Sequence, residues 1–264
     1  MLVRILTAVV LLAAFLAALL LLDQAWFSGF VGVVVALAAN EWARLTGWQG
    51  RTTYAYAAAC VLAWFALLQL PDLAGGLLLG ALLFWTCAVP YWLARGWRAS
   101  PPALAALTGL AVLVPAGVSM VVLPRGELLI LLGLVWIADS AAYFSGRAFG
   151  LHKLAPAISP GKTWEGVAGA GVCCLVYAII CAMVVPSLRA QIQGAVWVPY
   201  LFGAGFLCAV SVIGDLFESA VKRHAGAKDS GALLPGHGGV LDRIDAIAAA
   251  LPVGALLLRQ LQAP

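Results

Sequence analysis

The chain has 264 residues, of which 64% are hydrophobic and 10% are charged, and its formal net charge is +4. Soluble domains carry about 25% charged residues, so this composition excludes an ordinary soluble protein and indicates a membrane protein. We interpret the positive charge through membrane topology and anionic lipid headgroups, and expect no nucleic-acid partner. The six cysteines lie in apolar runs without metal-ligand spacing, which predicts packing residues and not disulfides or zinc ligands.

Apolar stretches of transmembrane length recur along the whole chain. A helix needs about 20 apolar residues to cross the hydrocarbon core of a bilayer. The stretches predict an all-α, polytopic membrane bundle of about nine transmembrane helices: residues 3–22, 27–43, 54–70, 74–93, 103–123, 127–145, 165–185, 196–214 and 240–258. The first is interpreted as a retained span, because it is longer than a signal-peptide core and LLLLDQAW lacks a small-x-small cleavage site.

The basic residues predict the orientation of this bundle. With the N-terminus in the cytoplasm, twelve of the fifteen Lys and Arg face the cytoplasm, and only Arg125, Arg189 and Arg259 face outward. This is the bias that the positive-inside rule demands. The C-terminus then lies outside, and the long polar loops at 146–164 and 215–239 face the cytoplasm, where soluble nucleotides can reach them.

Asp139 lies inside the sixth apolar stretch. A carboxylate there is costly unless it faces the interior of the bundle. Helical spacing places Asp139, Tyr143 and Arg147 on one face. We interpret this face as a polar wall of a functional site; a structural ion pair or a hydrogen bond between helices is the alternative.

The following loop reads SPGKTWEG over residues 159–166. Its Pro-Gly pair at 160–161 predicts a turn. Backbone N–H groups at the start of the next helix attract phosphate, and a nearby lysine adds charge. The polar residues expected to serve such a ligand are Lys162, Thr163 and Glu165. The Walker frame G-x-x-x-x-G-K-[ST] is absent, and a plain helix-capping loop is the alternative.

Residues 211–245 form the most densely polar segment of the chain. Helical spacing predicts two polar faces that can converge. These are Asp215, Glu218, Ser219 and Lys222 on one helix, and Asp242 with Asp245 on the next. Carboxylates of this kind suit Mg²⁺, which is usually bound by one or two carboxylates together with substrate phosphates.

Between the two faces lies the glycine-rich sequence KDSGALLPGHGG. Lys228 offers a point charge for phosphate, and the glycines are expected to let the backbone approach a ligand closely. His237, flanked by glycine, is expected to contact substrate or order the loop more readily than to bind a metal. A solvated loop is the alternative, but carboxylates and cations clustered at a membrane surface favour phosphoryl or nucleotidyl transfer.

Residues 219–245 resemble the signature of the phosphatidate cytidylyltransferase (CDP-diacylglycerol synthase) family. The matching positions are Ser219, Lys222, Arg223, Lys228, Asp229, Gly231, Leu234, Pro235, His237, Gly238, Gly239, Val240, Asp242, Arg243, Ile244 and Asp245. The motifs DSAAYFSGRAFG and SPGKTWEG are also similar to family motifs, and Glu41 stands where the family often has an acid. The chain departs from the family at Gly161, where Lys is common, and at Ala246, where Ser is common.

The resemblance implies transfer of CMP from CTP to phosphatidate, which yields CDP-diacylglycerol and pyrophosphate in phospholipid biosynthesis. It implies Mg²⁺ bound by Asp215 and Asp242, a second cation such as K⁺, and a homodimer in a bacterial-type cytoplasmic (inner) membrane. Residues 1–125 would form a scaffold of transmembrane helices that can supply dimer contacts, and residues 126–264 the catalytic transmembrane domain. The residues expected in catalysis are Asp215, Asp242, Asp245, Lys222, Arg223, Lys228, Asp229, His237 and Arg243. Those expected to bind substrate are Ser219, Gly238, Gly239, Asp139, Lys162, Thr163 and Glu165.

Two other functions compete with this interpretation. One is a CTP-dependent lipid-alcohol kinase, which would release CDP instead of pyrophosphate. The other is an ion-coupled secondary transporter with a site at Asp139 and Asp215. Transporters usually have repeat-related halves with broken helices at the midplane, whereas here the polar groups are concentrated in one half of the chain.

Overall fold

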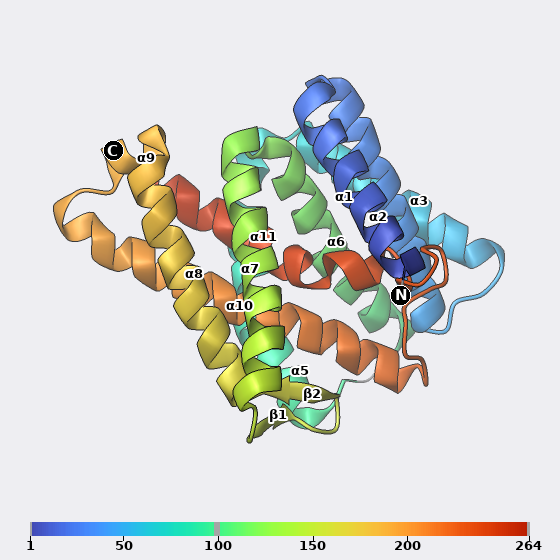
Figure 1. Ribbon diagram of the computed structural model, residues 1–264. Coiled ribbons are helices and arrows are strands. Elements are labelled where there is room, and N and C mark those ends of the chain that lie inside the picture. Colours follow the sequence, from blue (N-terminus) through green and yellow to red (C-terminus); the bar gives the residue numbers. More distant parts are fainter. Residues whose placement is uncertain (1, 98–100, 263–264) are drawn as a thin grey trace.

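A computed structural model describes residues 2–97 and 101–262, and it is helical over most of that length (Figure 1). The helices are α1 (Leu2–Leu21), α2 (Gln24–Leu45), α3 (Arg51–Leu68), α4 (Ala74–Leu83), α5 (Val89–Arg95), α6 (Pro102–Val122), α7 (Arg125–Phe149), α8 (Trp164–Val184), α9 (Pro186–Gln191), α10 (Trp197–His224) and α11 (Leu241–Gln262). The strands are β1 (Lys153–Ala155) and β2 (Ser159–Thr163). Short 3-10 turns at Pro71–Leu73 and Gly194–Val196 precede α4 and α10.

Seven helical runs in the described part of the chain are long and apolar enough to cross a membrane. They are Gln24–Leu45, Arg51–Leu68, Pro71–Arg95, Pro102–Val122, Arg125–Phe149, Trp164–Val184 and Gly194–His224. The prediction of an all-α, polytopic membrane protein is thereby confirmed. The other two predicted spans correspond to α1, which is apolar over Leu6–Leu21, and to α11. That these two also cross the membrane stays a prediction.

The third of these runs, Pro71–Arg95, contains a π-helical turn at Phe84–Ala88. Pro90 follows at the start of α5 and lacks the N–H that an α-helical bond would need, so the register changes there. The turn presents Trp85, which is 1% exposed, to Phe217 of α10 at 5.9 Å between ring centroids. This aromatic contact joins the N-terminal helices to α10.

A β-hairpin formed by β1 and β2 shows that the turn predicted at 160–161 was wrong. Residues 159–163 instead form β2, which pairs antiparallel with β1, and the turn lies at 156–158. Ile158 N–H closes it by donating to the Ala155 carbonyl at 3.1 Å. Because the sheet has two strands, β2 has a free edge, where a proline is tolerated. Figure 1 shows the hairpin at the end where α7 finishes and α8 begins.

The helix α10 continues to His224, ten residues beyond the predicted end of its span at 214. Its last turns remain helical because Leu216, Phe217 and Val221 are buried between the polar positions. The polar loop that follows is therefore residues 225–240, not 215–239. The predicted polar faces at 215–222 and 242–245 lie on α10 and α11, which pack against each other.

Both ends of α1 are attached to the rest of the bundle. The Arg125 guanidinium donates to the Leu19 and Leu22 carbonyls at the end of α1. Near its start, Thr7 Oγ1 lies 2.7 Å from His237 Nδ1 in the loop before α11. The side chain of Arg4 and the whole of Arg98, both placed on the cytoplasmic side by the charge distribution, lie outside the described residues.

The six cysteines are all free thiols, as the sequence predicted. Four of them, Cys60, Cys174, Cys181 and Cys208, are buried among apolar side chains.

Candidate functional site

A polar cavity of about 600 Å³ opens among α7, α8, α10, α11 and the β1–β2 hairpin. Its volume falls in the range of small-molecule sites. The charged side chains that line it are Asp139, Arg147, Lys162, Asp215, Lys222, Asp229, Asp242, Arg243 and Asp245. It thus brings together five carboxylates and four cations from segments that are up to 106 residues apart in the sequence.

The α7 wall of the cavity carries the three residues that helical spacing placed on one face. Asp139, Tyr143 and Arg147 all line the cavity. Arg147 donates from a guanidinium nitrogen to the Tyr143 hydroxyl at 3.2 Å. In this arrangement the Asp139 carboxylate faces the polar cavity and not lipid, which reduces the cost of burying it in a span.

The hairpin contributes a lysine and a helix cap. Lys162 Nζ lies 2.6 Å from Asp215 Oδ2, so the hairpin is joined to α10 across the cavity. Thr163 Oγ1 accepts a hydrogen bond from Gly166 N–H at 3.1 Å and caps α8. For Thr163 the capping interpretation therefore describes the structure, although this residue also lines the cavity.

Glu165 lies outside the cavity lining and serves the hairpin instead. Its carboxylate lies 2.6 Å from His152 Nδ1 and accepts the His152 backbone N–H at 3.2 Å. The carboxylate thereby holds the start of the hairpin against the first turn of α8.

Lys222 joins the polar faces of α10 and α11. Its Nζ lies 2.8 Å from Glu218 Oε2, one turn earlier on α10, and 2.5 Å from Asp242 Oδ1 on α11. The three side chains are between 5% and 12% exposed. Removing one partner from a buried ionic group of this kind leaves an uncompensated charge and costs about 3–5 kcal/mol. The two carboxylates therefore fix the position of the lysine, and the lysine links α10 to α11.

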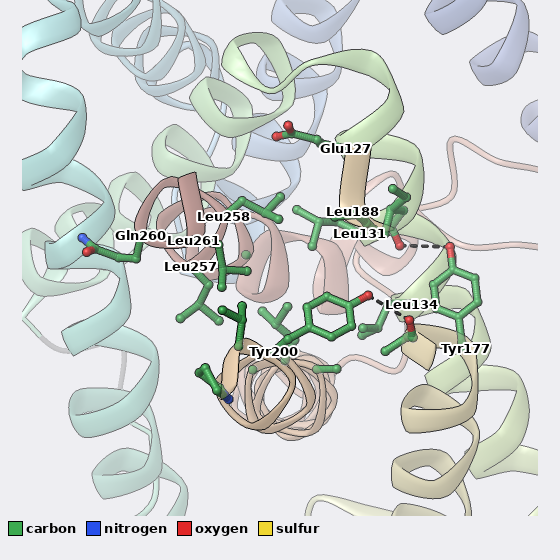
Figure 2. A pocket seen from close by; sticks show the side chains of 18 residues that line it. Glu127, Leu131, Leu134, Tyr177, Leu188, Tyr200, Leu257, Leu258, Gln260 and Leu261 are labelled. Atoms are coloured by element: carbon green, nitrogen blue, oxygen red, sulfur yellow. Dashed lines mark hydrogen bonds between the residues drawn. The ribbon is translucent and has the colours of Figure 1, made fainter. Parts of the chain in front are cut away.

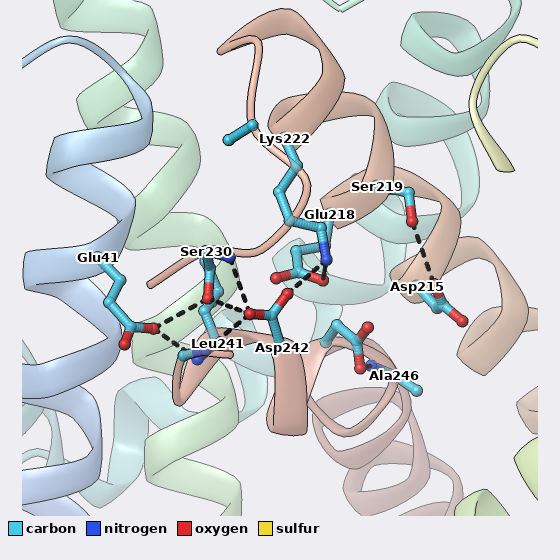
Figure 3. A network of polar contacts seen from close by, with 12 residues as sticks. Glu41, Asp215, Glu218, Ser219, Lys222, Ser230, Leu241, Asp242 and Ala246 are labelled. Atoms are coloured by element: carbon cyan, nitrogen blue, oxygen red, sulfur yellow. Dashed lines mark hydrogen bonds and ion pairs between the residues drawn. The ribbon is translucent and has the colours of Figure 1, made fainter. Parts of the chain in front are cut away.

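Asp242 also organises the loop before α11, as Figure 3 shows. Its Oδ2 accepts hydrogen bonds from Ser230 N–H, Ser230 Oγ and Gly239 N–H, each at 2.8 Å. Gly238 has φ of +79°, and a Cβ on it would lie 2.5 Å from the same oxygen. The missing Cβ at Gly238 leaves room for the Asp242 carboxylate. That the glycines also let the backbone approach a ligand stays a prediction.

Glu41, near the end of α2, is the second acceptor of this loop. It is 6% exposed. Its carboxylate accepts from Val240 N–H at 3.0 Å and Leu241 N–H at 2.8 Å, and it shares the Ser230 hydroxyl proton with Asp242, with Ser230 Oγ at 3.1 Å. The first two are backbone groups at the start of α11, where a negative charge is stabilised by the helix dipole.

Sequence reasoning reached Glu41 only through the family resemblance and did not single out Ser230. The available signal for Ser230 was its place between Asp229 and Gly231 inside the matched motif. Glu41 is 189 residues from Ser230, so no local pattern connects the two.

Several other expected residues lie close to the cavity without lining it. Ser219 Oγ donates to Asp215 Oδ1 at 3.3 Å. Arg223 donates to the Ile158 and Ala227 carbonyls, each at 3.4 Å, and so links the hairpin turn to the loop after α10. The His237 ring contacts Thr7 of α1, and its expected role in contacting substrate or ordering the loop stays a prediction. The expected residues not brought into the cavity lining are Glu165, Ser219, Arg223, Lys228, His237, Gly238 and Gly239.

The carboxylates of the cavity suit a cation that is completed by phosphate ligands. Within the described residues, no group of three or more His, Cys, Asp or Glu side chains is arranged to hold a metal ion by itself. Asp215 and Asp242 both line the cavity, and each has an ammonium group against it, from Lys162 and Lys222. Mg²⁺ commonly takes one or two carboxylates plus substrate phosphates, and this donor set fits that mode and not an all-protein cage.

Comparison with known proteins relates the whole chain to one family. Residues 2–261 match the model of the cytidylyltransferase family. The chain is 46% identical to the phosphatidate cytidylyltransferase of Pseudomonas aeruginosa, over 97% of this chain and 96% of that protein. It is 38% identical to the phosphatidate cytidylyltransferase of Haemophilus influenzae, over 94% and 95%. The protein of that name from Staphylococcus saprophyticus is 42% identical over 48% of this chain and 46% of its own length.

These matches confirm the resemblance seen in residues 219–245 and extend it to the N-terminal helices. The chain belongs to the cytidylyltransferase family.

Proposed function

We propose that this protein transfers CMP from CTP to phosphatidate, yielding CDP-diacylglycerol and pyrophosphate. The observation that carries the proposal is that five charged residues of the family motif, Lys222, Asp229, Asp242, Arg243 and Asp245, line one polar cavity inside an apolar helical bundle. Such a cavity lets a soluble nucleotide meet a lipid phosphate while the acyl chains stay in an apolar environment. The names of the full-length relatives support the same reaction.

The cationic side chains of the cavity differ in how tightly carboxylates hold them, and therefore in how readily they can bind a phosphate. Lys222 is held by two buried carboxylates. Lys162 forms a more exposed ion pair with Asp215, with side chains 24% and 31% exposed, and exposed pairs contribute only about 0–1 kcal/mol. We therefore assign phosphate neutralisation to Lys162, Arg147 and Arg243, and a positioning role to Lys222.

The reaction needs little acid–base chemistry. A phosphate oxygen of phosphatidate, already anionic, attacks the α-phosphorus of CTP and forms the new P–O bond. The bridging bond between the α- and β-phosphates breaks, and pyrophosphate leaves with the electron pair. Catalysis of such a transfer is mainly positioning and neutralisation of charge, which the cations of the cavity provide.

Mg²⁺ is part of this proposal, with Asp215 and Asp242 as the residues that would hold it and Asp229 and Asp245 in support. When bound, it would neutralise charge on the triphosphate. A second cation such as K⁺, which the family resemblance implies, is also part of this proposal. The homodimer that the family resemblance implies is also proposed here.

We further propose that the cavity faces the cytoplasm of a bacterial inner membrane. The hairpin and the loop at 225–240 lie at the ends of α7, α8 and α10 that the positive-inside rule assigns to the cytoplasm. CTP would then reach the site directly from the cytosol.

The proposed reaction is tested by following two labels on CTP. Purified protein in detergent is incubated with phosphatidate, Mg²⁺ and CTP labelled on either the α- or the γ-phosphate. The proposal predicts α-label in the lipid product and γ-label in pyrophosphate. A lipid-alcohol kinase would instead place γ-label in the lipid when diacylglycerol or another lipid alcohol is supplied, and release α-label as CDP.

A further inference from the structure

A second cavity, of about 440 Å³ and mostly apolar lining, lies inside the same group of helices (Figure 2). Its walls come from α7, α8, α10 and α11, with Leu131, Leu134, Ala204, Leu207 and Leu257 among the lining residues. It shares no lining residue with the polar cavity.

Four polar side chains belong to this lining. Glu127 and Gln260 lie at the end of the cavity away from the polar cavity, and the hydroxyls of Tyr177 and Tyr200 are hydrogen-bonded. The Tyr177 hydroxyl donates to the Ile130 carbonyl at 3.2 Å, and the Tyr200 hydroxyl donates to the Ala178 carbonyl at 2.9 Å. These hydrogen bonds direct the hydroxyls into the walls, so the tyrosines present their rings to the space. The cavity is thus suited to a hydrocarbon and not to a polar ligand.

The two cavities follow one another along the same four helices. On α7 the apolar cavity ends at Leu134 and the polar cavity begins at Asp139; on α10 the corresponding residues are Leu207 and Val212. Five helical residues span about 7.5 Å along the axis. The helices α8 and α11 run antiparallel to α7 and α10, and on them the residues of the apolar cavity have higher numbers than those of the polar cavity. The apolar cavity therefore lies on the same side of the polar cavity along all four helices.

We propose that this apolar cavity receives an acyl chain of the lipid substrate while the lipid phosphate occupies the polar cavity. The inference rests on the proposed function. A glycerol backbone and the first carbons of a chain are long enough to cover the short distance between the two cavities. Along α7 and α8, the residues between the two linings include Ala138, Ala170 and Cys174, which are small and buried.

This cavity would select the substrate by shape. Lipid tails are as apolar as the side chains that line it, so a chain moving from the bilayer into the cavity gains little hydrophobic free energy. Occupancy therefore depends on the available space, and a side chain that fills the cavity excludes long acyl chains before short ones.

Two glycines on α10 provide a matched pair of variants. Gly203 lines the apolar cavity, and an added Cβ would meet only Leu257 Cδ1, at an ordinary contact distance of 3.6 Å. Gly205 lies on an outer groove between α8 and α10 beside Phe202 and Phe206, and a Cβ there meets nothing within 4 Å. Gly203→Leu fills the cavity, and Gly205→Leu adds the same bulk outside it.

The experiment measures kcat/KM for dipalmitoyl and dioctanoyl phosphatidate in wild type and both variants. We expect Gly203→Leu to lower kcat/KM for the dipalmitoyl lipid at least ten-fold relative to the dioctanoyl lipid, with KM for CTP unchanged. Gly205→Leu should keep the wild-type ratio. Leu257→Ala, which enlarges the cavity, should shift the ratio toward the longer chain, and it serves as the test if Gly203→Leu does not fold.

An unchanged ratio in both Gly203→Leu and Leu257→Ala would overturn the inference. So would an equal loss with both lipids, which would indicate a structural lipid in the cavity, or an equal shift in Gly205→Leu. If wild-type protein makes no CDP-diacylglycerol from either lipid, the proposed function itself is wrong. An active enzyme whose variants show no change in chain-length selection would contradict only the inference about the apolar cavity.

Discussion

Asp242 and Glu41 show how single carboxylates can organise a loop that contains few apolar side chains. Together they accept hydrogen bonds from Ser230, Gly239, Val240 and Leu241, all in or just after the segment between α10 and α11. Hydrogen bonds to charged groups contribute about 1.5–3 kcal/mol each, roughly twice the neutral value. This is why the loop needs glycine at 238 and 239, where a Cβ would displace the carboxylates.

Glu41→Gln tests this arrangement at the level of one residue. The amide keeps the shape of the side chain, but one of its two ends becomes an NH₂ group that faces the N–H and hydroxyl donors of the loop. A buried donor left without a partner costs about 1–3 kcal/mol. We expect a loss of unfolding free energy of that size and a decrease of kcat of at least ten-fold. Thermal unfolding and initial-rate kinetics measure both.

The control for Glu41→Gln is Asp72→Asn. Asp72 lies on an exposed 3-10 turn and is distant in sequence from the residues of the cavity. This substitution changes the same kind of charge without touching the loop and should behave as wild type. Wild-type stability and kcat in Glu41→Gln would show that the loop does not depend on this carboxylate.

At the scale of elements, periodicity predicted the polar faces well and the hairpin poorly. The spacings at 139–147 and at 215–222 placed residues on shared faces, because a helix imposes its geometry on every residue it contains. The prediction of a turn at 160–161 was wrong, because these residues belong to β2, which pairs with β1. This strand ends at Thr163, which caps α8. Local turn preference carries no information about such a partner.

The helices α1 and α11 decide how many times the chain crosses the membrane. If both cross, the two ends of the chain lie on opposite sides. Alkaline phosphatase, which is active only outside the cytoplasm, should then be active when fused after residue 190 or after residue 264, and inactive after residue 150. An inactive fusion after residue 264, with an active one after residue 190, would show that α11 does not complete a crossing.

Over the whole molecule, the sequence predicted long apolar helices in both halves, but it predicted most of the site residues in the C-terminal half alone. The motif at 219–245 indicated the family, and its acids and Lys222 do meet in one cavity. The contributions of α1 and α2 depend on contacts across about 190–230 residues, from Glu41 to Ser230 and from Thr7 to His237. Contacts at that separation leave no periodic signal, and only the folded chain reveals them.

The same long-range contacts argue against treating the N-terminal helices as a passive scaffold. Trp85 packs against Phe217, next to Glu218 on α10, and Glu41 holds the start of α11. The cavity is therefore built from the C-terminal half but positioned by the N-terminal half.

The central claim is that the cavity around Asp242 carries out CMP transfer. Its most direct test is the rate at which purified Asp242→Asn converts α-labelled CTP and phosphatidate into labelled CDP-diacylglycerol, beside wild type and Asp72→Asn. The amide cannot supply two anionic oxygens to Lys222, the loop donors and a cation, so we predict no detectable product from Asp242→Asn that still elutes as folded protein, and wild-type rates from Asp72→Asn. Near-normal product formation by folded Asp242→Asn would contradict the account.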